Sequence, residues 1–495
     1  MENPGEGSVN LVVGSFGMKF KKQIITYFVF IIPTLILGQI QNNFSGYFDN
    51  YMINGLSDGK IIKIPFRMIS LNIQSNLNDF TLTSNFAMEF QLKSDPFSEK
   101  FDADIFWDIR ELYFIWFHPF GEFRIGKQIH TWGMVDENSP LDVVCAFDYH
   151  YLFSQGSERK IGTNSIAIDI YLNNWKFGGI FSPFHQTNRL PGNDGDFPIK
   201  MPIIPERPQL LEINEPPFEF GGFIERTFNW GDVRISYFQG LDRVYNFSGV
   251  NVFTVNKNDM SFFEYDIAYG YRRTRVLGLG TVLFIKDLVL RSDLGIFKTK
   301  DMNNSIKTES TIEDYPFHGN EFPTKEASDY YQFTFQFEYG LPFDISIGGQ
   351  YFNYDIIHYK SDEIPIKKCI KMTNFEICPE DVNPRNFFNP GMGTPLAVLT
   401  KQAAIITLEK TFLDDQLNFN LLSLLDIAKP KETNKTKIWG AMFGFTMEYN
   451  VTQNLHGVLG ITKILGKNAH PDGELYRFNS MEDFSHIRME LKYFF

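Results

Sequence analysis

Charged and amide side chains lie an even number of residues apart in two neighbouring stretches, at positions 108 and 110 and at positions 124 and 128. Successive side chains of a strand point to opposite faces, so these polar residues gather on one face of each stretch. If that face lines a water-filled pore, it forms a charge ladder that focuses ions or orients an anionic solute. The alternative is a salt-bridge network that braces the wall. The pore-lining and selectivity candidates are Asp108, Arg110, Arg124 and Gln128.

The long irregular segment after these stretches, residues 130–160, begins with a tryptophan and two spaced carboxylates. A loop that follows a pore-lining strand can fold inward and narrow the pore. The alternative is an ordinary external loop anchored by its tryptophan. The constriction candidates are Trp132, Asp136 and Asp142.

Three cysteines are too few for a scaffold built on disulfides. Cys369 and Cys378 lie close together in one loop, and in an exported protein this spacing favours a disulfide that closes a small hairpin. A metal site would need further ligands, and no histidine lies beside the two cysteines. The sequence therefore predicts a disulfide and no metal, with Cys145 left unpaired.

Motifs of common enzymes are missing from the sequence. There is no G-x-S-x-G, no H-E-x-x-H and no glycine-rich phosphate loop. A triad assembled across strands would leave no local motif, so catalysis stays open as the less favoured alternative. We expect a protein that is not an enzyme and needs no cofactor.

Long alternating segments must position these residues. Residues 80–93, 163–172 and 331–340 place apolar side chains at every second position and mostly polar ones between them, with no helical period. Aromatic residues make up 16% of the chain, yet its mean hydropathy is only −0.20. Segments of this length that face lipid on one side and water on the other are typical of membrane strands. We predict an all-β fold, a transmembrane antiparallel up-and-down β-barrel.

Short turns and long loops alternate along the chain. Eight short polar turns lie near residues 76–79, 118–121, 173–174, 229–232, 286–287, 341–344, 413–416 and 451–454. Short periplasmic turns and long extracellular loops distinguish the two ends of an outer-membrane barrel. Eight turns imply about 18 strands. Sixteen remains the alternative, because the strands near 44–76 and 263–285 are the weakest in pattern.

The N-terminal region has the layout of an export signal. Lysines at the start of residues 18–38 precede a short apolar run and a small residue, which fits a signal peptide better than a spanning helix. We expect residues 1–17 to be an upstream extension and residues 39–495 to form a single outer-membrane barrel of a Gram-negative bacterium.

The chain closes with an alternating strand that ends on Phe495. In a closed barrel the first and last strands must pair, so this strand has a partner. Its pattern resembles the C-terminal signal recognised by the bacterial barrel-assembly machinery.

A resemblance to a known family is carried by residues 110–144, RELYFIWFHPFGEFRIGKQIHTWGMVDENSPLDVV. This segment resembles a hallmark of a large, mostly uncharacterised family of porin-like Gram-negative outer-membrane barrels. The matching positions are Arg110, Glu111, Arg124, Gly126, Lys127, Gln128, Trp132, Gly133, Asp136, Pro140 and Asp142. The family usually has arginine where Lys127 stands. The resemblance implies a membrane barrel and passage of a substrate across the outer membrane.

These observations predict a porin-like channel for passive or facilitated diffusion of a small solute. The alternatives are a gated transporter of hydrophobic compounds and a closed barrel that acts as a receptor or docking component. A formal net charge of −13 argues against nucleic acid. The expected partners are outer-membrane lipids, the assembly machinery and the solute, and a homo-oligomer is compatible with the aromatic outer face.

Overall fold

The computed structural model describes residues 40–92, 103–154, 156–191, 196, 205–213, 216–257, 259–364, 370–371, 376–377, 383–428, 438–466 and 477–495. The expected extension and signal peptide, and Cys369 and Cys378, lie outside the described residues. A search of these ranges finds no helix with the length and apolar character that crossing a membrane requires.

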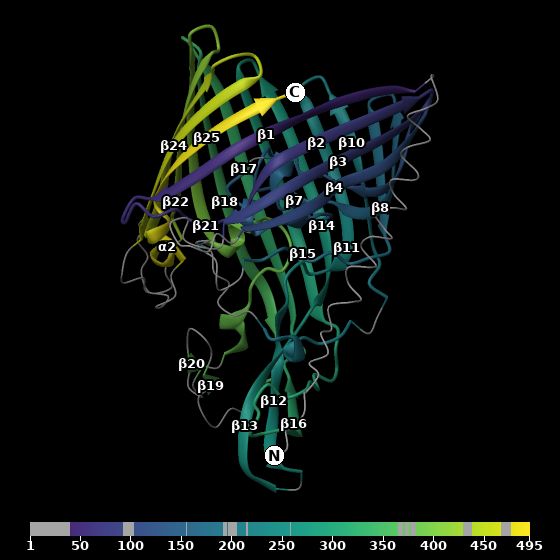
Figure 1. The fold of residues 1–495 in the computed structure, drawn as a ribbon. Coiled ribbons are helices and arrows are strands. Elements are labelled where there is room, and N and C mark those ends of the chain that lie inside the picture. The colour runs from purple at the N-terminus through teal and green to yellow at the C-terminus, as the bar shows by residue number, and fades with distance from the viewer. Residues whose placement is uncertain are drawn as a thin grey trace, which may run out of the picture.

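Eighteen strands form one closed antiparallel sheet (Figure 1). They are β1 (Gln41–Gly55), β2 (Phe66–Leu77), β3 (Phe80–Leu92), β4 (Ala103–His118), β5 (Gly121–Gln128), β8 (Thr163–Leu172), β9 (Trp175–Ser182), β10 (Glu219–Phe228), β11 (Gly231–Leu241), β14 (Arg272–Ile285), β15 (Leu288–Asp301), β17 (Ala327–Leu341), β18 (Ile345–Lys360), β21 (Gln402–Phe412), β22 (Leu417–Asp426), β23 (Gly440–Asn450), β24 (Leu455–Gly466) and β25 (His486–Phe494). Each barrel strand pairs with the next, and β25 pairs back with β1. The predicted barrel is confirmed with 18 strands, and the 16-strand alternative is wrong.

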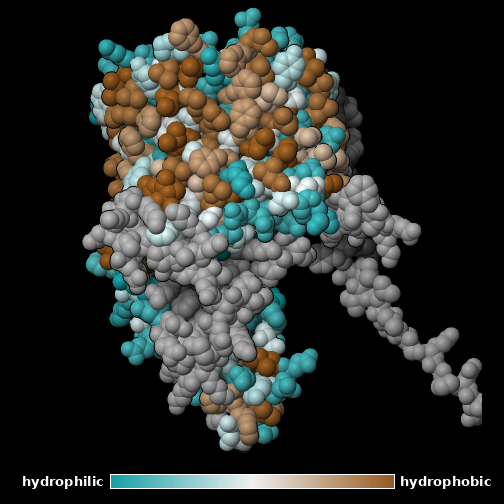
Figure 2. All heavy atoms as spheres, turned by 90° about the vertical axis from the view of Figure 1, so that its left-hand side faces the viewer, coloured by the Kyte–Doolittle hydropathy of each residue, from teal (hydrophilic) through white to brown (hydrophobic). Residues whose placement is uncertain are grey.

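Alternation along each strand separates a lipid-facing wall from a lumen. In β14, Leu277 and Leu279 are exposed, while Val276 and Gly278, the residues that precede them, are buried. The same alternation on neighbouring strands gathers aromatic and aliphatic side chains into a broad apolar band on the face of the barrel that Figure 2 shows. A closed sheet with such a band satisfies every backbone group internally and can therefore lie in lipid.

All eight predicted short turns join neighbouring barrel strands at one end of the barrel, the short-turn end. Asn78 and Asn173 have φ angles of 51° and 52°, the left-handed backbone that tight hairpin turns require and asparagine tolerates. β1 starts at this end, because Gln41 pairs with Asn76. Phe495 lies there as well and exchanges backbone hydrogen bonds of 2.9 and 3.1 Å with Gly46.

A three-stranded sheet projects from the opposite, long-loop end (Figure 1). Its strands β12 (Asn246–Asn256), β13 (Asp259–Gly270) and β16 (Phe317–Pro323) enclose a small core around Val250 and Ile267. The expected barrel strand at 263–285 is therefore corrected. Only β14 belongs to the wall, because β13 pairs with β12 outside the barrel.

Short elements complete the long-loop end. They are β6 (Ala146–Phe147), β7 (Lys160–Ile161), β19 (Ile370–Lys371), β20 (Glu376–Ile377), α2 (Arg477–Ser480), and the 3-10 turns η1 (Tyr149–Tyr151), η2 (Gly156–Arg159), η3 (Arg207–Gln209), η5 (Pro384–Phe387), η6 (Pro395–Val398) and η7 (Glu482–Phe484).

Candidate functional site: a loop across the barrel lumen

The described residues between β5 and β8, 129–154 and 156–162, fold into the barrel, and the segment is called the β5–β8 loop below. Most of its described apolar residues are buried like a protein core, among them Val135, Leu141, Val143 and Val144, although Phe153 is exposed. Burial of this kind removes apolar surface from water and favours the inward path over an external loop.

The loop reaches the far wall at Asp293 of β15. One oxygen of this carboxylate accepts hydrogen bonds from the backbone N–H groups of Met134 and Val135 at 2.8 and 3.0 Å, and from the Ser139 hydroxyl at 2.7 Å. A fully buried carboxylate is costly without such donors. Asp293 therefore acts as an acceptor for the loop backbone.

The tip of the loop continues to β17 and β18. The backbone N–H of Asp136 donates to the Gln336 side chain at 3.0 Å, and the Asn138 amide donates to Gln350 at 2.8 Å. Because β18 is the eighth strand from β5 in a sheet of eighteen, the loop spans nearly the full width of the barrel.

The base of the loop is held by Asp142. Its carboxylate accepts hydrogen bonds from the backbone N–H groups of Trp132 and Gly133 at 2.8 and 3.0 Å, and forms an ion pair with Lys160 at 2.9 Å. Burial opposes the charge, but Lys160 and the two N–H groups hold the pKa of Asp142 below its ordinary value. A Cβ at Gly133 would meet the Ser139 Cβ at 2.3 Å, so the turn requires glycine.

The Trp132 ring anchors the same base against the wall. It packs edge-on against Phe223 of β10 and Phe238 of β11, with ring centroids 5.6 and 6.1 Å apart. The Arg234 guanidinium of β11 donates to the Trp132 carbonyl at 2.6 Å. Trp132 therefore anchors a loop that folds into the barrel, and not the external loop of the alternative interpretation.

Arg110 lies under the loop. Its guanidinium forms an ion pair with Glu158 at 3.0 Å and donates to the Ser157 carbonyl at 2.7 Å, while Arg67 of β2 binds the other Glu158 oxygen at 2.5 Å. Burial raises the Glu158 pKa, but the two arginines outweigh it and the net shift is downward. Only 3% of Arg110 is exposed, so it holds the loop and does not contact open lumen.

The other three pore-lining candidates differ in environment. Arg124 is one-fifth exposed and forms ion pairs with Asp169 at 2.8 Å and Glu122 at 3.6 Å on the lumen wall. Gln128 is buried and donates to the Ser165 carbonyl at 3.1 Å. Asp108 is about half exposed and lies 3.5 Å from Lys127. The effect of these three residues on ion selectivity stays a prediction. Arg124, which is partly exposed on the lumen wall, is the best placed of them to act on passing ions.

Further ion pairs continue this mixed-charge lumen wall around the barrel. The pairs are Arg234–Glu225, Arg291–Glu338, Arg488–Glu490 and Lys492–Asp49. Apart from the buried Asp49, their side chains are partly exposed, and the alternating strand pattern directs them inward, away from exposed apolar neighbours such as Met489. Sequence reasoning did not single out these residues, although each is a charge on the polar face of an alternating strand.

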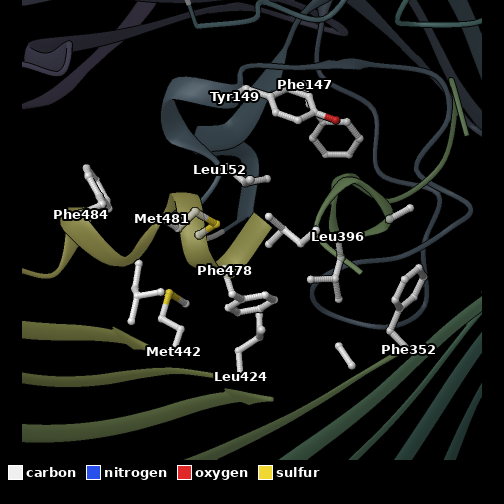
Figure 3. Packing of buried hydrophobic residues seen from close by; sticks show 14 of the residues in the cluster. Phe147, Tyr149, Leu152, Phe352, Leu396, Leu424, Met442, Phe478, Met481 and Phe484 are labelled. Carbon is white, nitrogen blue, oxygen red and sulfur yellow. The ribbon is translucent and has the colours of Figure 1, made fainter. Parts of the chain in front are cut away.

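Two further segments pack inside the long-loop end. Residues 383–401 approach β17, where the Gln332 amide donates to the Met392 carbonyl at 3.0 Å. Residues 477–485, with α2 and η7, contribute side chains to the apolar core at this end of the barrel. Figure 3 shows side chains of all three inward segments meeting over the barrel wall: Phe147, Tyr149, Leu152, Leu396, Phe478, Met481, Phe484, Phe352, Leu424 and Met442.

A small polar group lies beneath the loop base. The buried His130 ring lies 3.0 Å from the Ser165 hydroxyl, and its backbone N–H donates to the Cys145 sulfur at 3.1 Å. Burial, with help from the charges of Arg124 and Lys160, lowers the pKa of His130 to about 3, so the ring is neutral.

Within the described ranges, no cluster of three or more histidine, cysteine or acidic side chains could hold a metal ion. Cys145 is buried and unpaired.

The strand pairing, the apolar band and the charged lumen decide the class of fold. The chain is a closed, 18-stranded transmembrane β-barrel. This fold confirms the membrane barrel that the resemblance implied. Most of the positions that match the family make contacts within the β5–β8 loop or within the strands that adjoin it.

No protein-family model matches the chain, and no curated protein matches it. Similar solved structures include OpdK of Pseudomonas aeruginosa, at 10% identity over 92% of this chain and 99% of the other, with a TM-score of 0.44. OccK5 (OpdH) of Pseudomonas aeruginosa shows 11% identity, coverage of 92% and 98%, and a TM-score of 0.43. OccAB1 of Acinetobacter baumannii shows 8% identity, coverage of 92% and 96%, and a TM-score of 0.42. The fold assignment rests on the strand pairing of this chain itself.

Proposed function

We propose that this protein is a porin-like channel in the outer membrane of a Gram-negative bacterium, through which small polar solutes cross by passive or facilitated diffusion. The observation that carries the proposal is the lumen, which has a charged, partly exposed wall and a buried loop across it. An 18-stranded barrel encloses aqueous space wherever loops do not fill it.

In this account the apolar band anchors the barrel in lipid, and the lumen wall keeps the solute hydrated. The β5–β8 loop sets the width of the passage. Paired charges such as Arg124 with Asp169 favour solutes that bind weakly at several sites and leave again. The solute is therefore expected to be polar, with charges of either sign tolerated.

The same structure gives a second candidate, a gated barrel. Three inward segments share one apolar core at the long-loop end, and a core packs in discrete arrangements rather than continuously. A gate of this kind would open when the segments separate.

We further propose that β25 is the segment by which the assembly machinery receives the barrel, and that membrane lipids surround its apolar band.

Planar-bilayer conductance of the purified, folded full-length protein tests the proposal. Discrete current steps and a measurable reversal potential in a salt gradient are expected. Heat-dependent migration in detergent gels, which reports the folded barrel, serves as the folding control. A folded barrel that never conducts, at any voltage or pH, would contradict the channel and favour a docking role.

A further inference from the structure

Buried charged residues occupy the short connections through which the sheet of β12, β13 and β16 leaves the barrel (Figure 1). Asp242 and Arg243 lie between β11 and β12. Arg272 begins β14, two residues after the end of β13, and Glu326 immediately precedes β17. At most 4% of each of these four residues is exposed. Buried charges are costly unless partners are fixed around them, so their partners show what the projecting sheet is attached to.

Arg243 binds the base of the β5–β8 loop. One terminal nitrogen of its guanidinium donates to the carbonyls of Val143 and Val144 at 2.9 and 2.8 Å. The other terminal nitrogen pairs with the Glu219 carboxylate of β10 at 2.8 Å. The backbone N–H of Arg243 donates to the Gly391 carbonyl at 2.7 Å. A single residue therefore joins the projecting sheet to the β5–β8 loop, to the barrel wall and to residues 383–401.

Arg272 forms a second joint of the same kind. Its Nε donates to the Asp242 carboxylate at 2.8 Å, and a terminal nitrogen donates to the Asn389 carbonyl at 2.7 Å. The other terminal nitrogen forms an ion pair with Glu326, and the guanidinium lies 4.7 Å from the Phe388 ring centroid. Arg272 thus links all three connections of the projecting sheet with residues 383–401.

Close packing leaves these joints little room to move independently. A Cβ at Gly391 would meet the Asp242 carboxylate at 2.2 Å, so the two segments are in tight contact. Cys145, Arg243 and Met392 line a cavity of about 10 Å³, which is room for about one water molecule. Protein interiors packed in this way have low compressibility and transmit strain. A shift of the sheet connections therefore displaces the loop base.

We propose that Arg243 and Arg272 are positioning residues that couple the projecting sheet to the β5–β8 loop and to residues 383–401. A ligand that binds the sheet outside the barrel, and favours one of its positions, then moves the segments inside the lumen. The claim that this movement alters passage rests on the proposed channel function, whereas the coupling itself does not.

Cys145 provides a reporter of the loop base that needs no conductance. It is 2% exposed and directly follows the two carbonyls that Arg243 binds, so its reaction with N-ethylmaleimide reports opening of the base. Labelling of the Cys145 peptide is measured by mass spectrometry in the folded, full-length protein. The distant perturbation is Val250→Ala, which truncates a fully buried residue in the core of the projecting sheet. It is combined with Arg243→Gln in a double-mutant cycle.

Val250→Ala should raise the rate of Cys145 labelling at least threefold while Arg243 is present. Arg243→Gln should also raise it, but the double variant should react no faster than Arg243→Gln alone, because the joint is already broken. Arg243→Lys keeps the charge but not the paired donors, so it should retain part of the coupling. Leu279→Ala, a truncation on the lipid-facing wall, is the control and should react like the wild type.

Wild-type labelling in Val250→Ala would overturn the proposal. Effects that multiply in the double variant would also overturn it, because the sheet and Arg243 would then act independently. Heat-dependent gel migration checks folding, and Ile267→Val, a smaller truncation in the same core, replaces Val250→Ala if that variant does not fold. Conductance of the same variants separates the two claims, since coupled labelling in a barrel that never conducts would contradict the channel and support the coupling.

Discussion

Replacing Asp142 by alanine tests whether the β5–β8 loop depends on the contacts at its base. The substitution removes the acceptor for the Trp132 and Gly133 N–H groups and leaves Lys160 without its carboxylate. Among the described residues, Lys160 then keeps only neutral partners, the His130 carbonyl at 3.3 Å and the Thr131 hydroxyl at 3.0 Å.

The expected cost is large because the ion pair is buried on both sides. Removing one partner of such a pair costs about 3–5 kcal/mol. The loop can undock and return Lys160 to water, so we expect the docked state to lose about 3 kcal/mol relative to the undocked one. At about 1.4 kcal/mol for each factor of ten, the undocked population rises roughly 100-fold.

Limited proteolysis within residues 129–162 and single-channel recording measure this shift. Asp142→Ala should be cleaved faster and should visit a larger conductance more often, and Asp142→Asn should fall between it and the wild type, because the amide oxygen still accepts hydrogen bonds. The control is Asp108→Ala, which removes a half-exposed partner of Lys127 and should cost under about 1 kcal/mol. Wild-type cleavage and conductance in Asp142→Ala would refute the role assigned to the loop base.

Three further predictions concern selectivity, pH and barrel closure. Arg124→Ala removes one positive charge from the lumen wall and leaves Lys176 as the remaining cation beside Asp169. The reversal potential in a salt gradient should therefore shift toward cations, and an unchanged potential would remove Arg124 from the selectivity site. The folded-state pKa of Glu158 lies below its ordinary value of about 4.3, so its stabilisation of the loop is complete above that pH and is lost as the pH falls through the lower folded value. Conductance should therefore rise only below about pH 4, whereas a flat profile down to pH 3 would contradict the ion-pair account. Deletion of Phe495 removes two backbone hydrogen bonds to β1, so the fraction of heat-modifiable, folded barrel recovered from membranes should fall, and an undiminished fraction would count against this role of the last residue.

The barrel was predictable because its determinants are local. In residues 331–340, each outward aromatic alternates with a polar residue, and the structure places the whole segment in β17. The eight turns contain residues suited to tight connections, and each occurs where the sequence placed it. The sheet of β12, β13 and β16 was missed because a hairpin outside the membrane alternates in the same way as one inside it.

The site was less predictable because its contacts join distant parts of the chain. Arg124 and Asp169 lie on adjacent strands, and their pairing follows once the register is known. Asp293 lies 159 residues from Met134, whose backbone it binds, and no pattern in β15 shows which loop will reach it. Burial of Arg110 also depends on Glu158, which the loop brings from 48 residues away.

The most direct test of the central claim, that the β5–β8 loop limits passage through the lumen, is single-channel conductance with a shortened loop. Residues 134–140 are replaced by Gly-Ser-Gly, which keeps Trp132, Gly133 and Asp142 at the base but removes the contacts with Asp293, Gln336 and Gln350. In barrels shown to be folded by gel migration, the account predicts a clearly larger unitary conductance than in the wild type. Equal conductance in the two proteins would contradict it.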